Sequence, residues 1–360
     1  MKIQPGRRRR PLIATGVVPL LIALAACGGD DGGAGPGGGG GTGGGGGGGG
    51  TTTLRIAMPT STTSFANSDV AVADAMGYFE EAGLEVEVSN LRSGSSVTTG
   101  VVGGEFEVGG SSIEPVINAF AGGGEIKVIG SYTDRLEVEM VVAEDVQSPE
   151  DLKGKQVGIQ EVGAFREVMT RMVLEDAGLT AEDVQYISVN ANAYIGALVQ
   201  GQISSAILHP EQAIEAANQD DTLHSLVNLY EVEPDYFYGV YFVDAGWLEE
   251  NQEAAQGFAE ALTKAHRTMY DDREAVVPVI AEATGFEEEV IDGAWEVYME
   301  QVQAYPKNVG LEEDRLQYTV ERMQELGTLR GGAATDVTEL VDRGPMEAAV
   351  EELGEVEERS

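Results

Sequence analysis

The feature that most constrains the fold is a pattern of short apolar strands alternating with helices, which occurs twice along the chain. The segment Phe79–Leu84, a helix end followed by glycine and leucine, is matched by Leu174–Leu179. Gly104–Phe106 is matched in the same way by Gly201–Ile203, and both pairs lie about 95 residues apart. Strands and helices at this spacing predict mostly parallel sheets with helices on their faces. We interpret the repeat as two similar α/β units, and chance similarity of common signals is the alternative.

The predicted elements divide the chain into these two units and a helical remainder. In the first unit the predicted strands lie at 54–58, 84–88, 106–108 and 126–129, with helices at about 68–82 and 114–120. Gly109–Ser112 is predicted to be a loop. In the second unit the predicted strands lie at 156–159, 185–189, 204–208 and 225–229, followed by an aromatic strand at 238–243. Helical spacing then dominates at 252–271, 273–284, 287–303 and 311–326, and the acidic tail from about 345 is expected to fray.

The first 50 residues indicate export rather than folding. Lys2 and Arg7–Arg10 precede the apolar stretch Leu12–Ala26, a sequence typical of a secretory signal peptide. The stretch is shorter than the roughly 20 apolar residues of a transmembrane helix. Leu24–Cys27 resembles the bacterial lipobox, which implies that Cys27 is lipidated after cleavage; an ordinary signal with a chance cysteine is the alternative. The glycine-rich segment that follows is predicted to be a flexible tether.

Charge restricts the partners. The chain has 61 acidic and 22 basic residues, a net charge of −39, and loss of the basic leader would make it more acidic still. Such a surface repels nucleic acid and anionic lipid, which excludes both as partners. We interpret the acidity as a solvated surface suited to a salty habitat, and an acidic docking face is the alternative. About 300 residues beyond the tether exceed one ordinary hydrophobic core, so two lobes are expected.

Several short sequence segments, in their order along the chain, resemble those of the solute-binding proteins of ABC importers. They are Leu54–Ala57, Gly77–Leu84, Gly104–Gly109 and Ser148–Lys155, with a weaker match at Ala283–Gly285. The resemblance is to the nitrate, sulfonate, taurine and thiamine-pyrimidine-precursor group, the NMT1/THI5-like family. It implies a two-lobed α/β periplasmic-binding-protein fold of type II, with the ligand in a cleft between the lobes. It also implies a lipid-anchored monomer on the extracytoplasmic face that serves an ABC permease and its ATPase, without cofactor or metal.

On this resemblance the chain divides into five parts. They are the signal peptide 1–26, the lipidated Cys27 with the tether 27–52, lobe one at 53–140 plus 241–330, lobe two at 141–240, and a helical tail at 331–360.

In open parallel sheets, ligands bind beyond the carboxyl ends of the strands, where helix N-termini offer unpaired N–H groups. The expected ligand-binding residues therefore come from the loops after the strands. In lobe one they are Ser61, Thr62, Thr63, Ser93, Ser95, Ser111, Ser112, Tyr132 and Arg135. In lobe two, and near 238–243 where the chain is expected to cross back to lobe one, they are Glu161, Gly163, Asn192, His209, Glu211 and Tyr238. Helix capping explains the hydroxyl residues equally well. A solvent-facing loop is the alternative for His209, and core packing is the alternative for Tyr238.

The charge of the ligand stays open at this point. Hydroxyl loops with Arg92, Arg135 or Arg166 suit a sulfonate, nitrate or carboxylate, whereas Glu114, Glu161 and Glu211 suit a heterocycle with N–H donors. An enzyme is disfavoured because no nucleophile motif, phosphate loop or zinc spacing occurs in a chain with three histidines and one cysteine. Catalysis by carboxylates and a sensory, ligand-presenting role are the alternatives to transport.

Overall fold

The computed structural model describes residues 51–60, 63–330 and 336–359 of the 360-residue chain. The predictions for the signal peptide, Cys27, Ser61, Thr62 and the segment 331–335 lie outside the described residues. So does most of the predicted tether.

The first sheet has five strands in the order β2-β1-β3-β10-β4. These strands are β1 (Thr52–Met58), β2 (Leu84–Asn90), β3 (Val108–Ser112), β4 (Ile126–Gly130) and β10 (Gly239–Asp244). β1 pairs in parallel with β2 and β3, whereas β10 lies antiparallel between β3 and β4. The strand that joins β3 to β4 therefore comes from more than 100 residues further along the chain.

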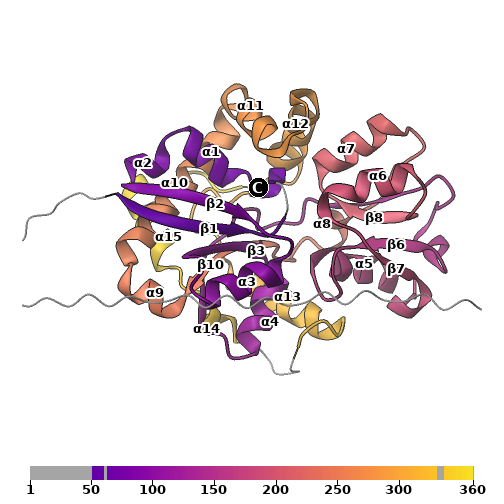
Figure 1. Cartoon of the computed structure of the whole chain (residues 1–360), viewed down its shortest axis with the longest axis horizontal. Helices are drawn as coiled ribbons and strands as arrows, with labels where there is room; N and C mark the ends of the chain where they lie inside the picture. Colours follow the sequence, from indigo (N-terminus) through magenta and orange to yellow (C-terminus); the bar gives the residue numbers. More distant parts are fainter. Residues whose placement is uncertain (1–50, 61–62, 331–335, 360) are drawn as a thin grey trace, which may run out of the picture. The chain divides into compact units, whose positions relative to one another are not determined.

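The second sheet repeats this arrangement in the order β7-β6-β8-β5-β9. Its strands are β5 (Glu139–Val142), β6 (Gln156–Ile159), β7 (Gln185–Ser188), β8 (Ser205–Leu208) and β9 (His224–Asn228). β6 pairs in parallel with β7 and β8, and β5 lies antiparallel between β8 and β9. The predicted two-lobed α/β fold is confirmed, and each sheet is mostly parallel, as predicted, with a single antiparallel strand (Figure 1).

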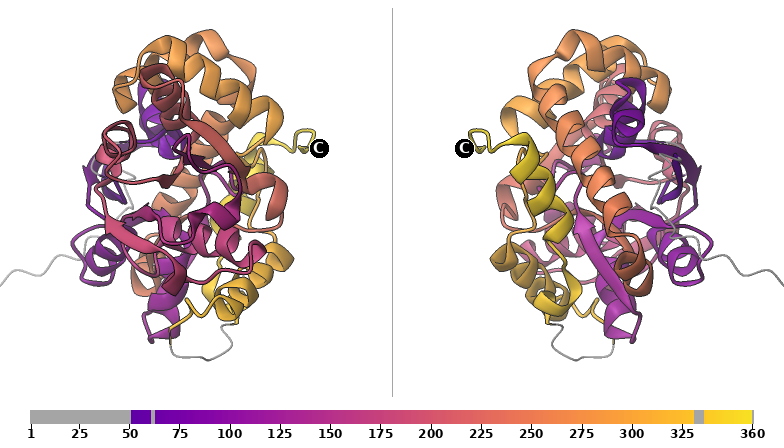
Figure 2. Two further views of the ribbon diagram at one scale, coloured as in Figure 1. Left: turned by 90° about the vertical axis from the view of Figure 1, so that its right-hand side faces the viewer. Right: turned by 90° about the vertical axis from the view of Figure 1, so that its left-hand side faces the viewer.

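Helices flank both sheets (Figures 1 and 2). Those of the first half are α1 (Asp69–Ala75), α2 (Tyr78–Glu81), α3 (Gly94–Val102), α4 (Ile113–Ala121), α5 (Phe165–Asp176), α6 (Tyr194–Val199), α7 (Pro210–Gln219) and α8 (Leu229–Val232). Those of the second half are α9 (Ala245–Glu250), α10 (Gln252–Asp271), α11 (Arg273–Thr284), α12 (Glu288–Trp295), α13 (Glu313–Glu325), α14 (Val337–Leu340) and α15 (Gly344–Leu353). The short helices η1 (Phe65–Asn67), η2 (Pro149–Leu152), η3 (Ala181–Asp183) and η4 (Ala191–Ala193) and the π-helical η5 (Glu296–Gln301) complete the set.

The predicted loop at Gly109–Ser112 is wrong, because these residues belong to the central strand β3. A β-carbon on Gly109 would lie 2.6 Å from the Phe242 ring, and one on Gly110 would lie 2.7 Å from the Met58 sulfur. Glycine is therefore required here because neighbouring side chains in the sheet approach the backbone closely. Composition alone does not distinguish this role from that of a turn.

Two helical predictions also differ from the structure. The single helix expected at 68–82 is broken into α1 and α2 at Gly77, whose φ of +77° is left-handed. The tail beyond 345 was expected to fray, but α15 packs along α10, and Met346 and Ala349 are buried against Ala259. The right-hand view of Figure 2 shows α15 in yellow beside α10.

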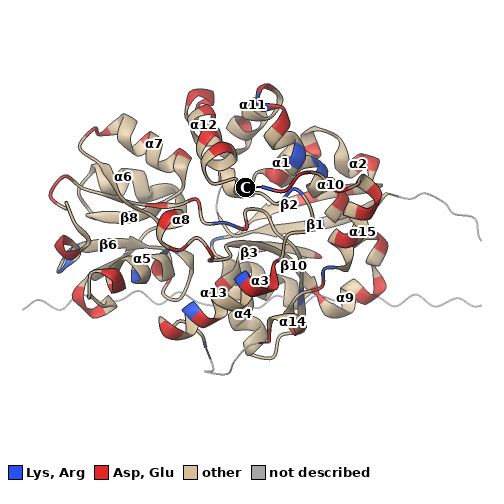
Figure 3. Cartoon of the chain, turned by 180° about the vertical axis from the view of Figure 1, so that it is seen from behind, with Lys and Arg blue, Asp and Glu red and all other residues tan. Residues whose placement is uncertain are grey.

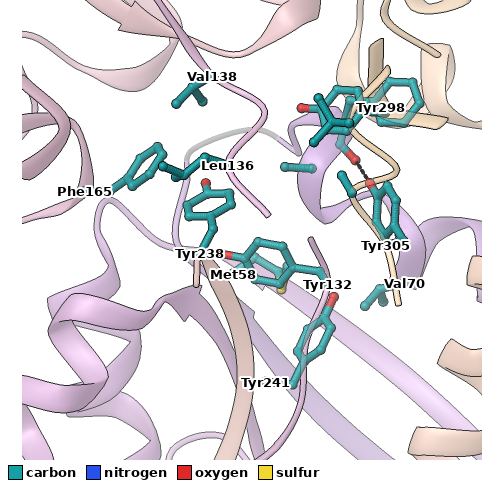
Figure 4. Packing of buried hydrophobic residues seen from close by; sticks show 14 of the residues in the cluster. Met58, Val70, Tyr132, Leu136, Val138, Phe165, Tyr238, Tyr241, Tyr298 and Tyr305 are labelled. Carbon is teal, nitrogen blue, oxygen red and sulfur yellow. Dashed lines mark hydrogen bonds between the residues drawn. The ribbon is translucent and has the colours of Figure 1, made fainter. Parts of the chain in front are cut away.

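Tyrosines provide many of the large, fully buried side chains near the point where the chain passes between the sheets. Tyr132 packs edge-on against Tyr238 and Tyr241, with ring centroids 5.6 and 5.5 Å apart. Tyr298 stacks on Phe65 at 4.2 Å. Figure 4 shows most of this aromatic cluster with Tyr305 alongside it. These hydroxyl-bearing rings place polar atoms deep in the protein, close to the cleft described next.

Acidic residues are scattered over the helices around both sheets rather than gathered in one patch (Figure 3). No helix of the described ranges is both long and apolar enough to span a bilayer.

Candidate functional site

A cleft lies between the loops that follow strands of the two sheets. Its larger cavity has a volume of about 500 Å³, and a smaller one of about 40 Å³ adjoins it. Both are lined by Thr60 and Ser64, which follow β1, and by Arg166 and His209, which follow β6 and β8. The cleft therefore sits beyond the carboxyl ends of strands, where open α/β sheets bind ligands.

Four helices begin at the smaller cavity. It is lined by Ser93 and Ser112, the residues at the N-caps of α3 and α4, and by Ala164 and His209, at the N-caps of α5 and α7. Each helix has at least nine residues. Two start from the first sheet and two from the second, so unpaired N–H groups and partial positive charge converge from both sides.

Arg166 is the basic residue that lines both cavities. It lies in the first turn of α5 and is only 4% exposed. Its Nε donates to the Ile207 carbonyl oxygen at 3.0 Å, and its Nη2 donates to Gln212 Oε1 at 3.0 Å. The guanidinium stacks 4.7 Å from the Tyr194 ring centroid. Within the described residues no carboxylate lies at ion-pair distance from it, so this buried cation is held by neutral groups.

Beside Arg166 lies a cluster of buried acids. His209 Nδ1 is 2.8 Å from Glu137 Oε1, and the Tyr298 hydroxyl lies 3.4 Å from both Glu137 and Glu211. The Phe65 backbone N–H donates to Glu211 Oε1 at 3.2 Å. Burial and the nearby Glu211 charge raise the pKa of Glu137 well above its usual range, and burial raises the pKa of Glu211 to about 7. Burial and Arg166 lower the pKa of His209, so all three groups favour their neutral forms.

An aromatic wall closes the inner side of the smaller cavity. The Phe165 and Tyr238 rings stack at 4.2 Å, and His209 lies 6.1 Å from each. Tyr238 lines this cavity, as predicted for a cleft residue, while Tyr132 is buried behind it against Gly239.

The structure brings only some of the predicted site residues together. Thr63, Asn192, His209 and Glu211 line the larger cavity, and Ser93, Ser112, His209 and Tyr238 line the smaller one. Ser95, Glu161 and Gly163 line a separate pocket of about 160 Å³, where the Ser95 hydroxyl donates to Glu161 Oε1 at 3.1 Å.

Besides the buried Tyr132, two more predicted residues lie elsewhere. Ser111 is fully buried in β3, and its hydroxyl oxygen has no hydrogen-bond partner among the described residues. Arg135 lines a pocket of about 380 Å³ together with Arg315 and Arg359, and it is not among the residues that line the cleft.

Sequence reasoning named Arg166 only as one of three arginines that suit an anion. Arg92 is exposed and Arg135 lies in another pocket, which leaves Arg166 in the cleft. Its position just after a strand and loop, in the first turn of a helix, is the signal that marks it. Ser64, Gln212 and the α11–α12 connection at Thr284–Glu287 also line the larger cavity and were missed. The α11–α12 connection lies far along the chain from the other lining residues, and no local sequence pattern indicates that it belongs to the cleft.

Residues 65–276 match the family model described as NMT1/THI5 like. The chain is 28% identical over 235 residues to a 4-amino-5-hydroxymethyl-2-methylpyrimidine phosphate synthase of Aspergillus parasiticus, over 61% of this chain and 65% of the synthase. It spans less than half of the length, 44%, of a binding protein of Brucella abortus that it matches at 25% identity over 39% of its own length.

The fold is also that of two solved binding proteins. The alkanesulfonate-binding protein SsuA from Xanthomonas axonopodis, bound to MOPS, has a TM-score of 0.67 at 17% identity, over 81% of this chain and 99% of that one. The nitrate-binding protein NrtA from Synechocystis has a TM-score of 0.71 at 13% identity, over 84% and 89%. At these identities the likeness establishes the fold.

Proposed function

Because this chain belongs to the NMT1/THI5-like family, we propose that it is the extracytoplasmic solute-binding lipoprotein of an ABC importer and captures a small organic anion. Several of the neighbouring structures are binding proteins for sulfonate or nitrate, which supports a binding role for this fold. The ligand would close the two lobes around it, and the closed form would deliver it to a membrane permease.

The observation that carries the proposal is the convergence of four helix N-termini and Arg166 on the smaller cavity. A helix N-terminus attracts anions, and a buried guanidinium without a carboxylate partner leaves a positive charge to be neutralised. A sulfonate or carboxylate oxygen would complete this set. The larger cavity, at about 500 Å³, has the size of an ordinary small-molecule site and would hold the organic part.

A second candidate ligand follows from the acids of the larger cavity. Glu211, Glu215 and Glu287 line it, and these carboxyl groups suit N–H donors of a pyrimidine-like heterocycle. A ligand with a heterocycle and an anionic group would use both sets. A sensory role would use the same cleft without a permease, and an enzyme would convert the ligand, so product formation separates the enzyme from both.

Isothermal titration calorimetry with ethanesulfonate, taurine, nitrate and an aminopyrimidine carboxylate tests the ligand class. We expect at least one anion to bind and the Arg166→Gln variant to weaken that binding about 100-fold, since a charge-assisted hydrogen bond in a buried site is lost. Arg92→Gln, an exposed arginine near the cleft, is the matched control and should change affinity less than about threefold. Equal affinity of the Arg166→Gln and wild-type proteins for every anion would refute the proposal.

The proposed lipid anchor is tested independently of the ligand. Cys27→Ala should move the protein from the membrane fraction to the soluble fraction of the producing cells, because the acyl chains proposed at Cys27 would no longer hold it in the bilayer. Unchanged membrane association would contradict the anchor and leave the binding proposal standing.

A further inference from the structure

We propose that Glu137 is a positioning residue that places a proton on the ligand-facing nitrogen of His209, so that anion capture is coupled to uptake of one proton. This inference rests on the proposed capture of an anion. It assigns to the side chains of Glu137 and His209, rather than to backbone N–H groups, the control of how tightly the anion is held.

The geometry fixes which nitrogen serves the ligand. His209 Nδ1 lies 2.8 Å from Glu137 Oε1, and the two side chains are 3% and 0% exposed. Because Nδ1 is occupied by this contact, Nε2 is the ring nitrogen left for a ligand. His209 lines both cavities of the cleft, next to Arg166. Glu137 and His209 both belong to the second-sheet side, since β5 and β8 are paired neighbours, so the contact does not depend on cleft closure.

The number of protons on the pair decides what Nε2 offers. The reference state is an ionised Glu137 carboxylate beside a neutral imidazole. With one more proton, either Glu137 is protonated and donates to Nδ1, or the imidazole is doubly protonated. In both cases Nε2 carries a proton and donates to an anion. If that proton is missing, Nδ1–H donates to the Glu137 carboxylate and Nε2 presents a lone pair, which repels an anionic oxygen. The conclusion therefore holds wherever the extra proton resides.

The surroundings favour the protonated pair. Tyr298 has one hydroxyl proton, yet both Glu137 and Glu211 lie 3.4 Å from its oxygen, so one carboxylate at most receives it. Glu137 Oε2 has no hydrogen-bond partner among the described residues, which disfavours a full negative charge there. The raised pKa of Glu137 also favours the protonated form of the pair. The ionisable groups that face the pair are Arg166 of α5, Glu211 of α7, Tyr132, Tyr238, Tyr298 and Tyr305.

Closure of the cleft would strengthen the effect. The stacked pair Phe65 and Tyr298 covers the acids, and Phe65 follows β1 on the first-sheet side. An opened cleft would return water to Glu211 and remove its bond from the Phe65 N–H. Closing over an anion thus buries the acids and favours proton uptake at the same step.

Nitrogen-15 NMR of the histidine rings tests the inference first without any ligand. We expect His209 Nε2 to carry a proton in the ligand-free protein at low pH. As the pH rises, Nε2 should lose this proton while Nδ1 gains or keeps one. The spectrum does not depend on whether a chosen anion binds, so this result separates the inference from the proposed function. A His209 Nε2 that stays bare at every pH would overturn it.

Calorimetry with ethanesulfonate then tests the coupling. Above the pH at which the pair titrates, the wild-type Kd should rise about tenfold per pH unit, with one proton taken up per anion bound as judged from buffers of different ionisation enthalpy. Glu137→Gln removes the charge of this pair, so its Kd should rise with pH less steeply than the wild-type Kd, and Glu211, with a pKa of about 7, accounts for the rise that remains. Glu139→Gln, a partly buried carboxyl at the first residue of β5 and two residues after Glu137, is the control and should keep the wild-type pH dependence. A wild-type Kd that varies with pH no more than that of Glu137→Gln would refute the coupling.

Discussion

His266 and Asp69 form a completely buried pair, with Nε2 of the imidazole 2.9 Å from Oδ2 of the carboxylate. The other ring nitrogen lies 3.0 Å from the Pro306 carbonyl oxygen, which can only accept, so Nδ1 carries a proton. The Tyr241 hydroxyl donates to the second Asp69 oxygen at 2.6 Å. Every polar atom of the pair is thus satisfied, and the pair ties α1 to α10.

The His266–Asp69 pair gives the first prediction. Asp69→Ala should lower the free energy of unfolding by about 3–5 kcal/mol, because it leaves the imidazole and the Tyr241 hydroxyl buried without their acceptor. Urea denaturation of the purified protein measures this. The control is Asp292→Ala, which breaks an exposed pair with Arg273 and should cost less than about 1 kcal/mol. Similar losses in both variants would contradict the prediction.

A second prediction concerns the C-terminal segment. Arg359 donates from two nitrogens to the two oxygens of Asp134, each at 2.6 Å, and Asp134 is fully buried between β4 and β5. Burial alone would raise the pKa of Asp134, but the Arg359 charge, with Arg315 and Arg135, lowers it below the usual range. Arg359→Gln should therefore lower the free energy of unfolding by about 3 kcal/mol at pH 7.

The sign of the pH dependence follows from the lowered pKa of Asp134. Its ionisation stabilises the fold above the unfolded pKa of about 4, and this contribution is lost as the pH falls through the lower folded pKa. The difference between wild-type and Arg359→Gln proteins should shrink below pH 4. Lys153→Gln, which breaks an exposed pair with Asp183, should show little effect at either pH. A difference that grows on acidification would rule out this role for Arg359.

The third prediction tests a contact across the cleft. The Ser95 hydroxyl on α3 donates to Glu161 after β6, at 3.1 Å, and neither residue lines the two main cavities. Glu161→Ala should weaken binding of an anion about two- to tenfold by favouring the open form, since one hydrogen bond of about 1 kcal/mol is lost. The ionic strength should be kept constant, and Glu182→Ala, an exposed acid, is the control. Tighter binding by Glu161→Ala would show that the contact opposes closure.

A fourth prediction concerns the approach of Tyr132 to β10. A β-carbon on Gly239 would lie 2.0 Å from the Tyr132 ring, which is itself fully buried against Tyr238 and Tyr241. Gly239→Ala should cost at least about 1–3 kcal/mol in unfolding free energy through overpacking. Gly196→Ala, inside helix α6, where a β-carbon would meet only the Gln200 side chain at an ordinary contact distance of 3.7 Å, should instead stabilise by about 0.5–1 kcal/mol. Thermal unfolding distinguishes the two signs.

The sequence pattern was sufficient for the class of fold and for much of its helical part, because α10 and α11 have the predicted bounds of 252–271 and 273–284. It was insufficient for β3, where glycines that admit Phe242 and Met58 have the same composition as a turn. His209 was predicted for the cleft from a strand end followed by Pro210, a local signal.

Whether Arg135 or Arg166 faces the cleft depends on residues far away in the chain. The pocket of Arg135 is shared with Arg359, whereas Arg166 is held by Ile207 and Gln212. No local periodicity carries that information, because it arises only when both sheets are in place. The charge of the ligand therefore cannot be predicted from a sequence this acidic without knowing which charged residues line the cleft.

The position of β10 has a consequence for the time at which each sheet forms. All strands of the second sheet lie between residues 139 and 228, whereas β4 of the first sheet pairs with β10 and with no other strand of that sheet. A chain emerging from a ribosome or a membrane channel, amino end first, completes the second sheet before the first one can close. The strands β1 to β4, which are synthesised first, thus cannot form the complete first sheet until β10 has been made.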